Sequence, residues 1–400
     1  MKLLMTGASG FLGAQLVPML AAAGVDLVLV GRDPARLKSL AENARCGSYE
    51  ELRELLEGVD AVMHLAVLNN TAEASEDEFR AANVELTRTI AEAARAAKVP
   101  TFINVSSFHA LDDGPDTPYA RSKREAIRVL SAIDGINIVN LFLPAVHGER
   151  FAGKLAVLEK LPKGLRRPAF AILSALAPTV SVKRIAGTLV STDFFKASDE
   201  PMFPADPKEE NLVYRLGRGL IDYGFALSVI LLFWWLLAII WVLVKTGSPG
   251  PGIFAQDRVG KGGKVFVCYK FRSMAKGTKQ AGTHEVSQSS VTPIGNFIRK
   301  TKIDELPQVW NILKGELSLV GPRPCLPVQT ELVHERTKRG VLTVLPGITG
   351  LAQIKDIDMS DPVRLSKKDA EYIARRGLLL ELKIIIATFT GKGRGDRVAK

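Results

Sequence analysis

The residues best suited to chemistry are an adjacent carboxylate pair, Asp304 and Glu305, in the second half of this 400-residue sequence. Lysines precede the pair closely, and a rigid Gly-Pro-Arg-Pro turn follows it at residues 321–324. A carboxylate can attack a phosphorus atom to form an acyl phosphate, which splits one difficult transfer into two easier steps. Taken alone, Asp304 would more simply be the N-cap of a helix over residues 306–313. The surrounding cations favour chemistry on an anionic phosphate.

The basic charge of the chain is concentrated in the same half. Residues 1–200 carry 23 Lys and Arg against 24 Asp and Glu, whereas residues 201–400 carry 30 against 18. Such an excess suggests an anionic partner, either phospholipid headgroups, a phosphorylated substrate or nucleic acid. We expect no nucleic acid partner, because the basic residues are scattered and share the region with an apolar segment. That segment, residues 225–244, is uncharged over twenty residues and long enough to cross a bilayer.

The N-terminal half opens with a second arrangement suited to phosphate. A short apolar strand leads into three glycines and then into a helix rich in Ala and Leu. Glycines let the backbone approach a pyrophosphate, and a helix N-terminus offers free N–H groups and a positive dipole. A tight turn without a ligand is the simpler alternative, but the strands and helices that follow favour a cofactor site. The residues predicted to bind the cofactor here are Gly7, Gly10, Phe11, Leu12 and Gly13.

Alternating strands and helices predict the fold of this half. Strands are expected at residues 2–5, 27–30, 61–65, 102–105 and 136–142, which is typical of a Rossmann-type, doubly wound parallel α/β sheet.

After the second strand, Gly31 stands where NAD binders usually place a carboxylate, and Arg32 follows. An arginine there accommodates a 2′-phosphate, so we favour NADP(H) over NAD(H). The alternative is that Arg32 is an ordinary loop residue and Asp33 caps the next helix.

Three further residues could exchange a proton with a substrate. Tyr119 and Lys123 are four apart and share one helical face, and Ser107 ends a predicted strand. A lysine ammonium favours the phenolate of a nearby tyrosine, and a serine hydroxyl would polarise the same substrate oxygen. Alone, the Tyr-Lys pair would be an ordinary solvated helix face. The glycine motif and the strand end make the catalytic interpretation the better one.

Together these motifs resemble the short-chain dehydrogenase/reductase superfamily. Within it, Asp-Ala-Val-Met-His-Leu-Ala at residues 60–66 and Asn-Val-Glu-Leu-Thr at residues 83–87 look like the NAD-dependent epimerase/dehydratase branch, which acts on nucleotide sugars. The resemblance implies that the cofactor is also contacted by Asp60, Ala66, Asn83 and Lys123. The substrate-binding lobe looks shortened, so a non-catalytic sensor remains an alternative.

The second half carries several motifs in a characteristic order. They include Tyr-Lys-Phe-Arg-Ser-Met at residues 269–274, Asp-Glu-Leu-Pro-Gln at 304–308, Gly-Pro-Arg-Pro at 321–324 and Pro-Gly-Ile-Thr-Gly at 346–350. Over residues 213–393 they resemble the monotopic phosphoglycosyl transferases, or bacterial sugar transferases. This family has its nucleophile at the Asp of Asp-Glu, which implies Asp304, and Glu305 with Asp304 would bind Mg²⁺. The cations implied to neutralise the substrate pyrophosphate are Lys270, Arg272, Arg299 and Arg323.

The chain is predicted to contain four segments. They are an oxidoreductase domain over residues 1–197, a linker over 198–212, a membrane-associated helix over 213–246 and a small, mainly helical α/β transferase domain over 247–400. Because both halves would use cytosolic substrates, we expect a re-entrant helix at the cytoplasmic face of the bacterial inner membrane. The proline kink usual in the family is missing at Trp234 and Trp235. An apolar helix over residues 377–390 is expected either on the membrane interface or in the core.

These expectations combine into a bifunctional membrane enzyme of bacterial glycoconjugate biosynthesis, such as polysaccharide or lipopolysaccharide assembly. The second half would transfer a sugar 1-phosphate from a UDP-sugar to undecaprenyl phosphate and release UMP. The first half would reduce a UDP-4-keto-6-deoxy-N-acetylhexosamine with NAD(P)H. A nucleotide-sugar 4-epimerase and a non-catalytic binding module that regulates the transferase are the alternatives for the first half. Membrane lipid is a further expected partner, and a homodimer is left open.

Overall fold

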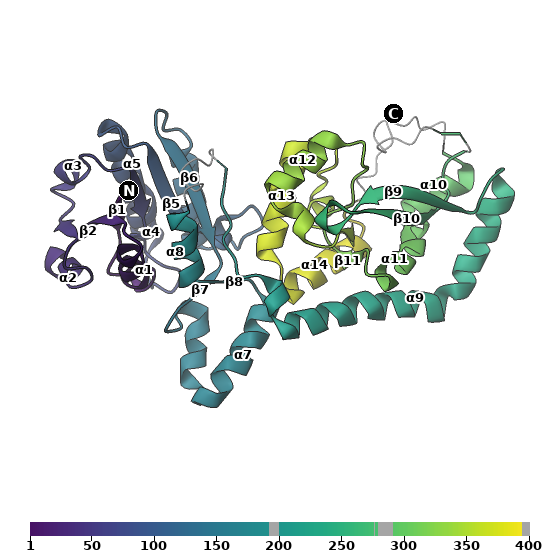
Figure 1. Ribbon diagram of the computed structural model, residues 1–400, viewed down its shortest axis with the longest axis horizontal. Coiled ribbons are helices and arrows are strands. Elements are labelled where there is room, and N and C mark those ends of the chain that lie inside the picture. Colours follow the sequence, from purple (N-terminus) through teal and green to yellow (C-terminus); the bar gives the residue numbers. More distant parts are fainter. Residues whose placement is uncertain (192–199, 276, 279–290, 394–400) are drawn as a thin grey trace. The chain divides into compact units, whose positions relative to one another are not determined.

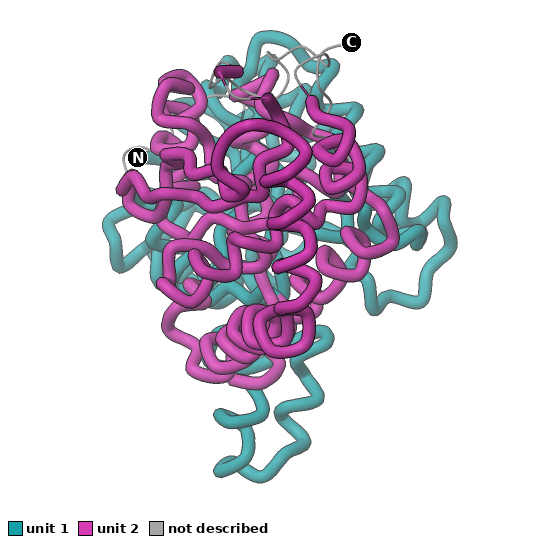
Figure 2. Tube along the Cα trace, turned by 90° about the vertical axis from the view of Figure 1, so that its right-hand side faces the viewer, with its two compact units in different colours: residues 1–170, 178–206 teal, residues 171–177, 207–400 magenta. Residues whose placement is uncertain are grey.

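The computed structural model describes residues 1–191, 200–275, 277–278 and 291–393 (Figure 1). The chain forms two compact units, which Figure 2 colours separately. Unit 1 consists of Met1–Phe170 and Pro178–Asp206, and unit 2 consists of Ala171–Ala177 and Pro207–Lys400. The predicted domain boundary at residues 197–198 lies outside the described residues.

A six-stranded parallel sheet forms the centre of unit 1, in the order β3-β2-β1-β4-β5-β6. This is the strand order of the doubly wound dinucleotide-binding fold, so the predicted fold class is confirmed. A separate parallel pair consists of β7 (Ala145–His147) and β8 (Thr179–Ser181). The strands of the main sheet are β1 (Lys2–Thr6), β2 (Asp26–Val30), β3 (Arg45–Gly47), β4 (Ala61–His64), β5 (Thr101–Ser107) and β6 (Asn137–Leu143).

Nearly continuous apolar runs explain why these segments form strands. Leu3, Leu4 and Met5 of β1 are fully buried, as expected for a central strand covered on both faces. One face of the sheet packs against α1 and α8, and the other against α3, α5 and α6. The helices of unit 1 are α1 (Phe11–Ala22), α2 (Pro34–Lys38), α3 (Leu52–Leu55), α4 (Glu76–Arg80), the π-helix η1 (Ala81–Glu85), α5 (Leu86–Ala96), η2 (Phe108–Ala110), α6 (Pro118–Leu130), η3 (Gly153–Lys160) and α8 (Val182–Val190). Helix α7 (Lys163–Leu176) begins in unit 1, and its residues from Ala171 onward belong to unit 2.

Residues 200–206, part of the stretch predicted as a linker, are bonded to unit 1. The Met202 backbone forms two hydrogen bonds with β6. The Asp206 carboxylate accepts a hydrogen bond from the Ser181 backbone at 3.0 Å and lies 2.7 Å from His147 Nε2. These contacts fix the segment along the sheet edge and beside the β7–β8 pair.

Unit 2 is mainly helical with two short strand pairs, as predicted. The pair β9 (Ile253–Val259) and β10 (Val265–Phe271) is an antiparallel hairpin, and β11 (Ser318–Val320) lies parallel to β12 (Gly347–Thr349). Apolar side chains of β10, α9 and α11 form a common core. The helices are η4 (Lys208–Glu210), α9 (Leu212–Gly247), η5 (Lys261–Gly263), α10 (Pro293–Lys300), η8 (Ile303–Gln308), α11 (Val309–Leu313), α12 (Thr330–Lys338), η9 (Val341–Thr343), η10 (Gln353–Lys355), α13 (Pro362–Arg375) and α14 (Leu378–Phe389).

Within the described residues, α9 is the one helix long and apolar enough to cross a membrane. Its large apolar side chains are exposed: Leu220, Leu231 and Trp234 have 76%, 68% and 63% of their surface accessible. Exposed apolar surface of this extent marks a membrane or protein contact. Helix α14 was expected either at the membrane interface or in the core. It has buried and exposed apolar side chains, since Ile384 is fully buried and Phe389 is 75% exposed. Both observations are consistent with membrane association.

Helix α9 bends at Phe233, whose φ of −118° and ψ of 15° are not helical (Figure 1). The bend occurs without a proline, and a side-chain hydrogen bond lies beside it. The indole N–H of Trp235 donates to the Leu232 carbonyl at 2.9 Å. A side chain that bonds a helix carbonyl interrupts the backbone ladder and is an established cause of kinks. We infer that this bond contributes to the bend at Phe233.

Replacing Trp235 by Phe removes this donor and should straighten α9. Spin labels at the exposed positions 227 and 243, on a Cys46→Ser background, should move toward a Cα separation of about 24 Å, the length of sixteen helical residues. Pulsed EPR in lipid nanodiscs measures the distance. Trp234→Phe is the matched control, because the described residues show no hydrogen bond from the Trp234 indole. Equal distances in the native protein and both variants would contradict the role of Trp235.

Candidate active sites

Asp304 and Glu305 lie inside the 3-10 helix η8, which continues into α11. Both residues are buried, each with 8% of its surface exposed. Lys302 occupies the N-cap, so Asp304 is not the cap that the alternative interpretation required. The backbone of Lys302 has a φ of 58°, a left-handed conformation that is uncommon outside glycine and frequent near functional sites. This turn ends α10 and starts a new helix at the carboxylate pair.

One oxygen of Glu305 is shared by two cations. Lys270 Nζ lies 3.1 Å and Arg323 Nη2 lies 2.8 Å from Glu305 Oε1. Burial alone would raise the pKa of Glu305, but the charges of Arg323 and Lys270 outweigh it and lower the pKa to about 2. The structure thus brings together three residues that were predicted from separate motifs, with Asp304 adjacent in the chain.

Asn311, to which the sequence analysis gave no role, fixes the strand that carries Lys270. Its amide nitrogen donates to the Val267 carbonyl at 2.7 Å, and its amide oxygen accepts from the Tyr269 N–H at 3.2 Å. Because Asn311 is fully buried and bonds β10 with both ends of its amide, it sets the register between α11 and the strand. A lone amide inside the apolar run Val-Trp-Asn-Ile-Leu is the sequence signal that could have identified it.

The Gly-Pro-Arg-Pro turn is held through its backbone carbonyls. Arg336 donates to the Arg323 carbonyl at 2.7 Å, and Arg258 donates to the Pro324 carbonyl at 3.0 Å. Arg336 is in turn paired with Asp369 at 2.7 Å, and both side chains are only 2% exposed. The backbone that presents Arg323 to Glu305 is therefore supported by charged side chains from outside the turn.

Arg272 makes no hydrogen bond or ion pair with this cluster, and its phosphate role remains a prediction. Its guanidinium donates to the carbonyls of Val244, Ser248 and Pro249 at 2.7 to 3.0 Å. A buried arginine with these partners satisfies the carbonyls at the C-terminal end of α9. Arg299 lies half-buried in the last turn of α10, and its phosphate role remains a prediction.

Glu305 retains one carboxylate oxygen that could bind a magnesium ion. The hydrogen bonds and ion pairs that described residues make with the Glu305 side chain all fall on Oε1, which leaves Oε2 for a cation. No group of three or more His, Cys, Asp or Glu suited to a metal occurs in the described residues. Mg²⁺ commonly takes one or two carboxylates, and substrate phosphates and waters complete its shell. Asp304 and Glu305 supply that number of carboxylates.

In unit 1 the glycine loop lies at the carboxyl ends of β1 and β4. Gly7 has a φ of 72°, and a Cβ there would lie 2.5 Å from the Ala66 nitrogen. Gly13 is similarly close to the backbone of Ala8. Only glycine fits these positions, so the loop and Ala66 are adjacent at the edge where this fold binds dinucleotides. The N-cap and first helical residues of α1 are Gly10, Phe11 and Leu12.

Asp60, Asn83 and Arg32, also predicted to contact the cofactor, lie outside the glycine loop. Asp60 precedes β4 at the amino edge of the sheet, where its carboxylate accepts the Lys2 N–H at 2.7 Å. It therefore lies at the opposite edge from the glycine loop, and its predicted cofactor role is corrected. Asn83 is buried and bonds the Leu68 backbone with both ends of its amide, so it shapes the loop after β4. Arg32 is exposed at the carboxyl end of β2, and the next residue caps α2.

Ser107, Tyr119 and Lys123 come from β5 and α6. Burial raises the pKa of Tyr119, and a hydrogen bond with Ser107 opposes this rise only in part. The Lys123 ammonium donates to the Val105 carbonyl at 3.0 Å, and burial lowers the pKa of Lys123 to about 7. The expected lowering of the Tyr119 pKa by Lys123 is therefore absent. His109, which the sequence analysis missed, lies with its Nδ1 3.0 Å from Ser107 Oγ.

His64, a second residue without a predicted role, connects the strands below the glycine loop. Its Nδ1 lies 2.7 Å from Thr6 Oγ1, and its Nε2 lies 3.0 Å from Thr87 Oγ1. Burial, assisted by the charge of Lys123, lowers the pKa of His64 to about 3. The ring is therefore neutral near pH 7 and ties β4 to β1 and α5.

Comparison with known proteins gives a separate family match for each of the two units. Residues 213–393 match the family model of the bacterial sugar transferases, and residues 3–169 match that of the NAD dependent epimerase/dehydratase family. An uncharacterized sugar transferase of Bacillus subtilis is 42% identical over 161 residues, which cover 40% of this chain and 76% of the relative. The chain belongs to the bacterial sugar transferase family, and its N-terminal residues match the model of the epimerase/dehydratase family.

Other relatives match over a smaller share of their length. The UDP-N-acetylgalactosamine-undecaprenyl-phosphate N-acetylgalactosaminephosphotransferase of Aeromonas hydrophila is 38% identical over 186 residues, 44% of this chain and 43% of the relative. The UDP-glucose:undecaprenyl-phosphate glucose-1-phosphate transferase of Xanthomonas campestris is 36% identical over 185 residues, 43% of this chain and 38% of the relative. Among solved structures, UDP-glucuronic acid 4-epimerase of Bacillus cereus with NAD is 21% identical, covers 48% of this chain and 73% of its own, and gives a TM-score of 0.38.

Replacing Arg323 by Met should raise the pKa of Glu305, because Lys270 alone then opposes burial. In the native fold this pKa is about 2, below the ordinary value of 4.5, so the interaction stabilises the fold above pH 4.5 and is lost as the pH falls toward 2. The variant should lose about 1.5–3 kcal/mol of unfolding free energy at pH 6 and progressively less below pH 4.5.

Denaturant unfolding in EDTA between pH 2.5 and 7 measures this difference. Arg364→Met, at an exposed arginine on α13, is the control and should show a small difference that does not change with pH. A destabilisation by Arg323→Met that is equal at pH 6 and pH 3 would show that the Glu305 charge is not what Arg323 stabilises.

Proposed function

We propose that unit 2 transfers a sugar 1-phosphate from a UDP-sugar to undecaprenyl phosphate. The observation that carries this proposal is the buried Asp304–Glu305 pair, with Lys270 and Arg323 on Glu305, in a unit that also contains the long apolar helix α9. The Aeromonas and Xanthomonas relatives are both named for a UDP-sugar donor and undecaprenyl phosphate as acceptor. Their names differ in the sugar, so the sugar of this chain is left to the assay.

In the proposed first step, an Asp304 carboxylate oxygen attacks the phosphorus that carries the sugar. The bond from this phosphorus to the bridging oxygen breaks, and UMP leaves with that oxygen. In the second step, a phosphate oxygen of undecaprenyl phosphate attacks the same phosphorus, and the bond to Asp304 breaks. The carboxylate is restored, and the lipid carries the sugar diphosphate. Dividing the transfer in this way replaces one difficult displacement by two easier ones.

Lys270 and Arg323 would stabilise the charge that develops on the pyrophosphate. Both cations are already held at Glu305, so little reorganisation is needed when the substrate binds, and preorganised charge of this kind is an effective source of catalysis. Mg²⁺ held by Glu305 and Asp304 would supply further neutralisation of the phosphate oxygens.

For unit 1 we propose binding of NADP(H) or NAD(H) at the glycine loop and reduction of a UDP-4-keto-6-deoxy-N-acetylhexosamine. The cofactor would supply hydride to C4, and Tyr119 would give its proton to the C4 oxygen, assisted by Ser107. The exposed Arg32 at the end of β2 supports NADP(H). One observation favours a regulatory binding module instead, because Tyr119 has a raised pKa and Lys123 a lowered one.

We further propose that the protein acts at the cytoplasmic face of the bacterial inner membrane, with α9 re-entrant. The bend at Phe233 and the exposed apolar side chains of α9 and α14 support this arrangement. It would give both units access to cytosolic nucleotide sugars.

Replacing Asp304 by Asn should abolish transfer, because the amide is not a nucleophile. With the full chain in nanodiscs, undecaprenyl phosphate, Mg²⁺ and a panel of UDP-sugars, we expect native UMP release and a loss of at least about 1,000-fold in the variant. Intact mass should show a trapped sugar phosphate on the native chain without lipid acceptor. Asp361→Asn, at the N-cap of α13, is the matched control and should keep native activity. Native UMP release by Asp304→Asn would exclude Asp304 as nucleophile.

Unit 1 is tested with the same full chain, UDP-4-keto-sugar and NADPH. Loss of absorbance at 340 nm in the native protein, reduced at least about 100-fold in Tyr119→Phe, is the expected result. Conversion between 4-epimers without net oxidation would replace the reductase by an epimerase. Cofactor binding with neither reaction would support the binding module.

A further inference from the structure

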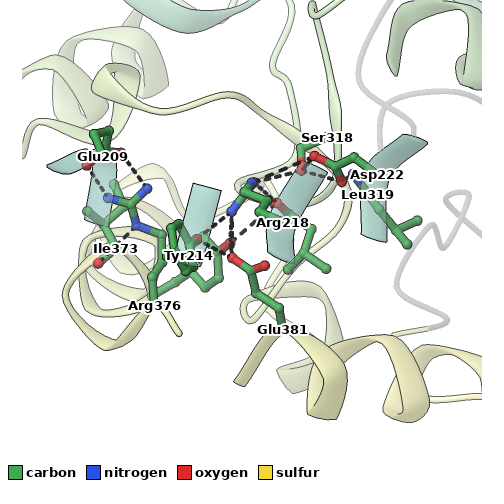
Figure 3. A network of polar contacts seen from close by, with 11 residues as sticks. Glu209, Tyr214, Arg218, Asp222, Ser318, Leu319, Ile373, Arg376 and Glu381 are labelled. Carbon is green, nitrogen blue, oxygen red and sulfur yellow. Dashed lines mark hydrogen bonds and ion pairs between the residues drawn. The ribbon is translucent and has the colours of Figure 1, made fainter. Parts of the chain in front are cut away.

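Helix α9 and strand β11 share a buried polar network that the proposed chemistry does not use (Figure 3). Tyr214, Arg218 and Asp222 are spaced by four residues, so they lie on one face of α9. In Figure 3 Arg218 lies between Ser318 of β11 and Glu381 of α14, with Tyr214 on one side and Asp222 on the other, beside Ser318 and Leu319. The network therefore connects the long apolar helix with two other elements of unit 2.

Arg218 bonds both of these elements at once. Its Nη1 donates to Glu381 Oε1 at 2.5 Å, and its Nη2 donates to the Val320 carbonyl at 2.6 Å and to Ser318 Oγ at 2.7 Å. The Arg218 side chain is 15% exposed and that of Glu381 only 1%. A guanidinium can bridge in this way because its N–H groups diverge in one rigid plane.

Asp222, one turn further along α9, holds the same strand. Its carboxylate accepts the Leu319 N–H at 2.8 Å and the Ser318 hydroxyl at 2.7 Å. Each of the three residues of β11 is thus bonded to α9. Val320, the last of them, leads directly into the Gly-Pro-Arg-Pro turn, whose Arg323 contacts Glu305.

Stability does not explain why these charged residues occupy the helix. A buried ion pair is often no more stabilising than apolar side chains of similar volume, because desolvation offsets the attraction. Association of α9 with a bilayer requires only apolar residues. Leucines at positions 218 and 222 could serve both purposes, but they could not bond the backbone of β11. The directional bonds to the strand are what the charged residues add.

We propose that Arg218 and Asp222 are positioning residues for the phosphosugar transfer. They fix β11 to α9 and thereby hold Arg323 at Glu305, in a frame set by the helix that contacts the membrane. The proposal rests on the function proposed for unit 2. It assigns α9 a part in assembling the active site in addition to membrane contact.

Arg218→Lys tests this directly. The lysine keeps a positive charge beside Glu381, but one ammonium cannot also reach Val320 and Ser318. Backbone amides of residues 318–321 and 323 should then exchange faster with solvent, and UMP release per active site should fall about 100-fold, the cost of a small misplacement. Arg215→Lys, at an exposed arginine on the same helix, should change neither measurement.

A double mutant separates positioning from general destabilisation. If Arg218 acts through Arg323, adding Arg218→Lys to Arg323→Met should cause little further loss of rate, whereas independent effects would multiply. Multiplied losses would overturn the proposal, as would native exchange and native rate in Arg218→Lys. Asp222→Asn, which keeps an acceptor for the Leu319 N–H, provides a milder second variant with the same expected pattern.

A native chain that releases no UMP would refute the function proposed for unit 2 and not the attachment of β11. Amide exchange at residues 318–321 and 323 would then decide the remaining question. Faster exchange in Arg218→Lys than in Arg215→Lys would support the attachment, and equal exchange would overturn it.

Discussion

The arrangement of unit 2 depends on one buried carboxylate oxygen. Glu305 Oε1 collects a cation from β10 and another from the turn after β11, so three segments distant in sequence meet at a single atom. Removing one of the two cations leaves Glu305 with a single opposite charge, and the expected loss of about 1.5–3 kcal/mol is a large part of a domain's stability. The three segments must therefore be held in fixed positions relative to one another. Asn311 does this for the strand, and a set of arginines does it for the turn.

These arginines give part of the basic excess in the second half a structural role. Arg218, Arg258 and Arg336 each donate to a backbone carbonyl between residues 320 and 324, and Arg272 donates to carbonyls at the end of α9. A guanidinium suits this task because it stays charged and offers several donors in fixed directions. Part of the positive charge that suggested an anionic partner is thus used inside the protein. The composition could not separate these structural cations from Lys270 and Arg323.

The sequence predicted what depends on local pattern and missed what depends on tertiary contact. The five strands expected for unit 1 are present because buried parallel strands are nearly continuous apolar runs, whereas β3, β7 and β8, each three residues long, have no comparable signal. Motif order brought Asp304, Glu305, Lys270 and Arg323 to one site. Motif matching also assigned Asp60 to the cofactor site. The motif gives no indication that Asp60 lies at the amino edge of the sheet, where it bonds the Lys2 N–H. The bend at Phe233 was also not predicted, since no proline marks it and the Trp235–Leu232 hydrogen bond beside it is visible only in the structure.

The candidate sites of the two units differ in whether a buried side chain keeps its charge. Glu305 is buried beside two opposite charges and remains ionised, with a pKa of about 2. Lys123 is buried against a carbonyl, and within the described residues no carboxylate bonds it, so its pKa falls to about 7. The cluster at Glu305 therefore has its charges in place without a bound ligand. The Tyr119–Lys123 site, in contrast, needs an additional polar or anionic group nearby before Lys123 can favour a phenolate. A dinucleotide on the adjacent glycine loop would bring such groups, so the acid-base chemistry proposed for unit 1 would depend on a bound cofactor.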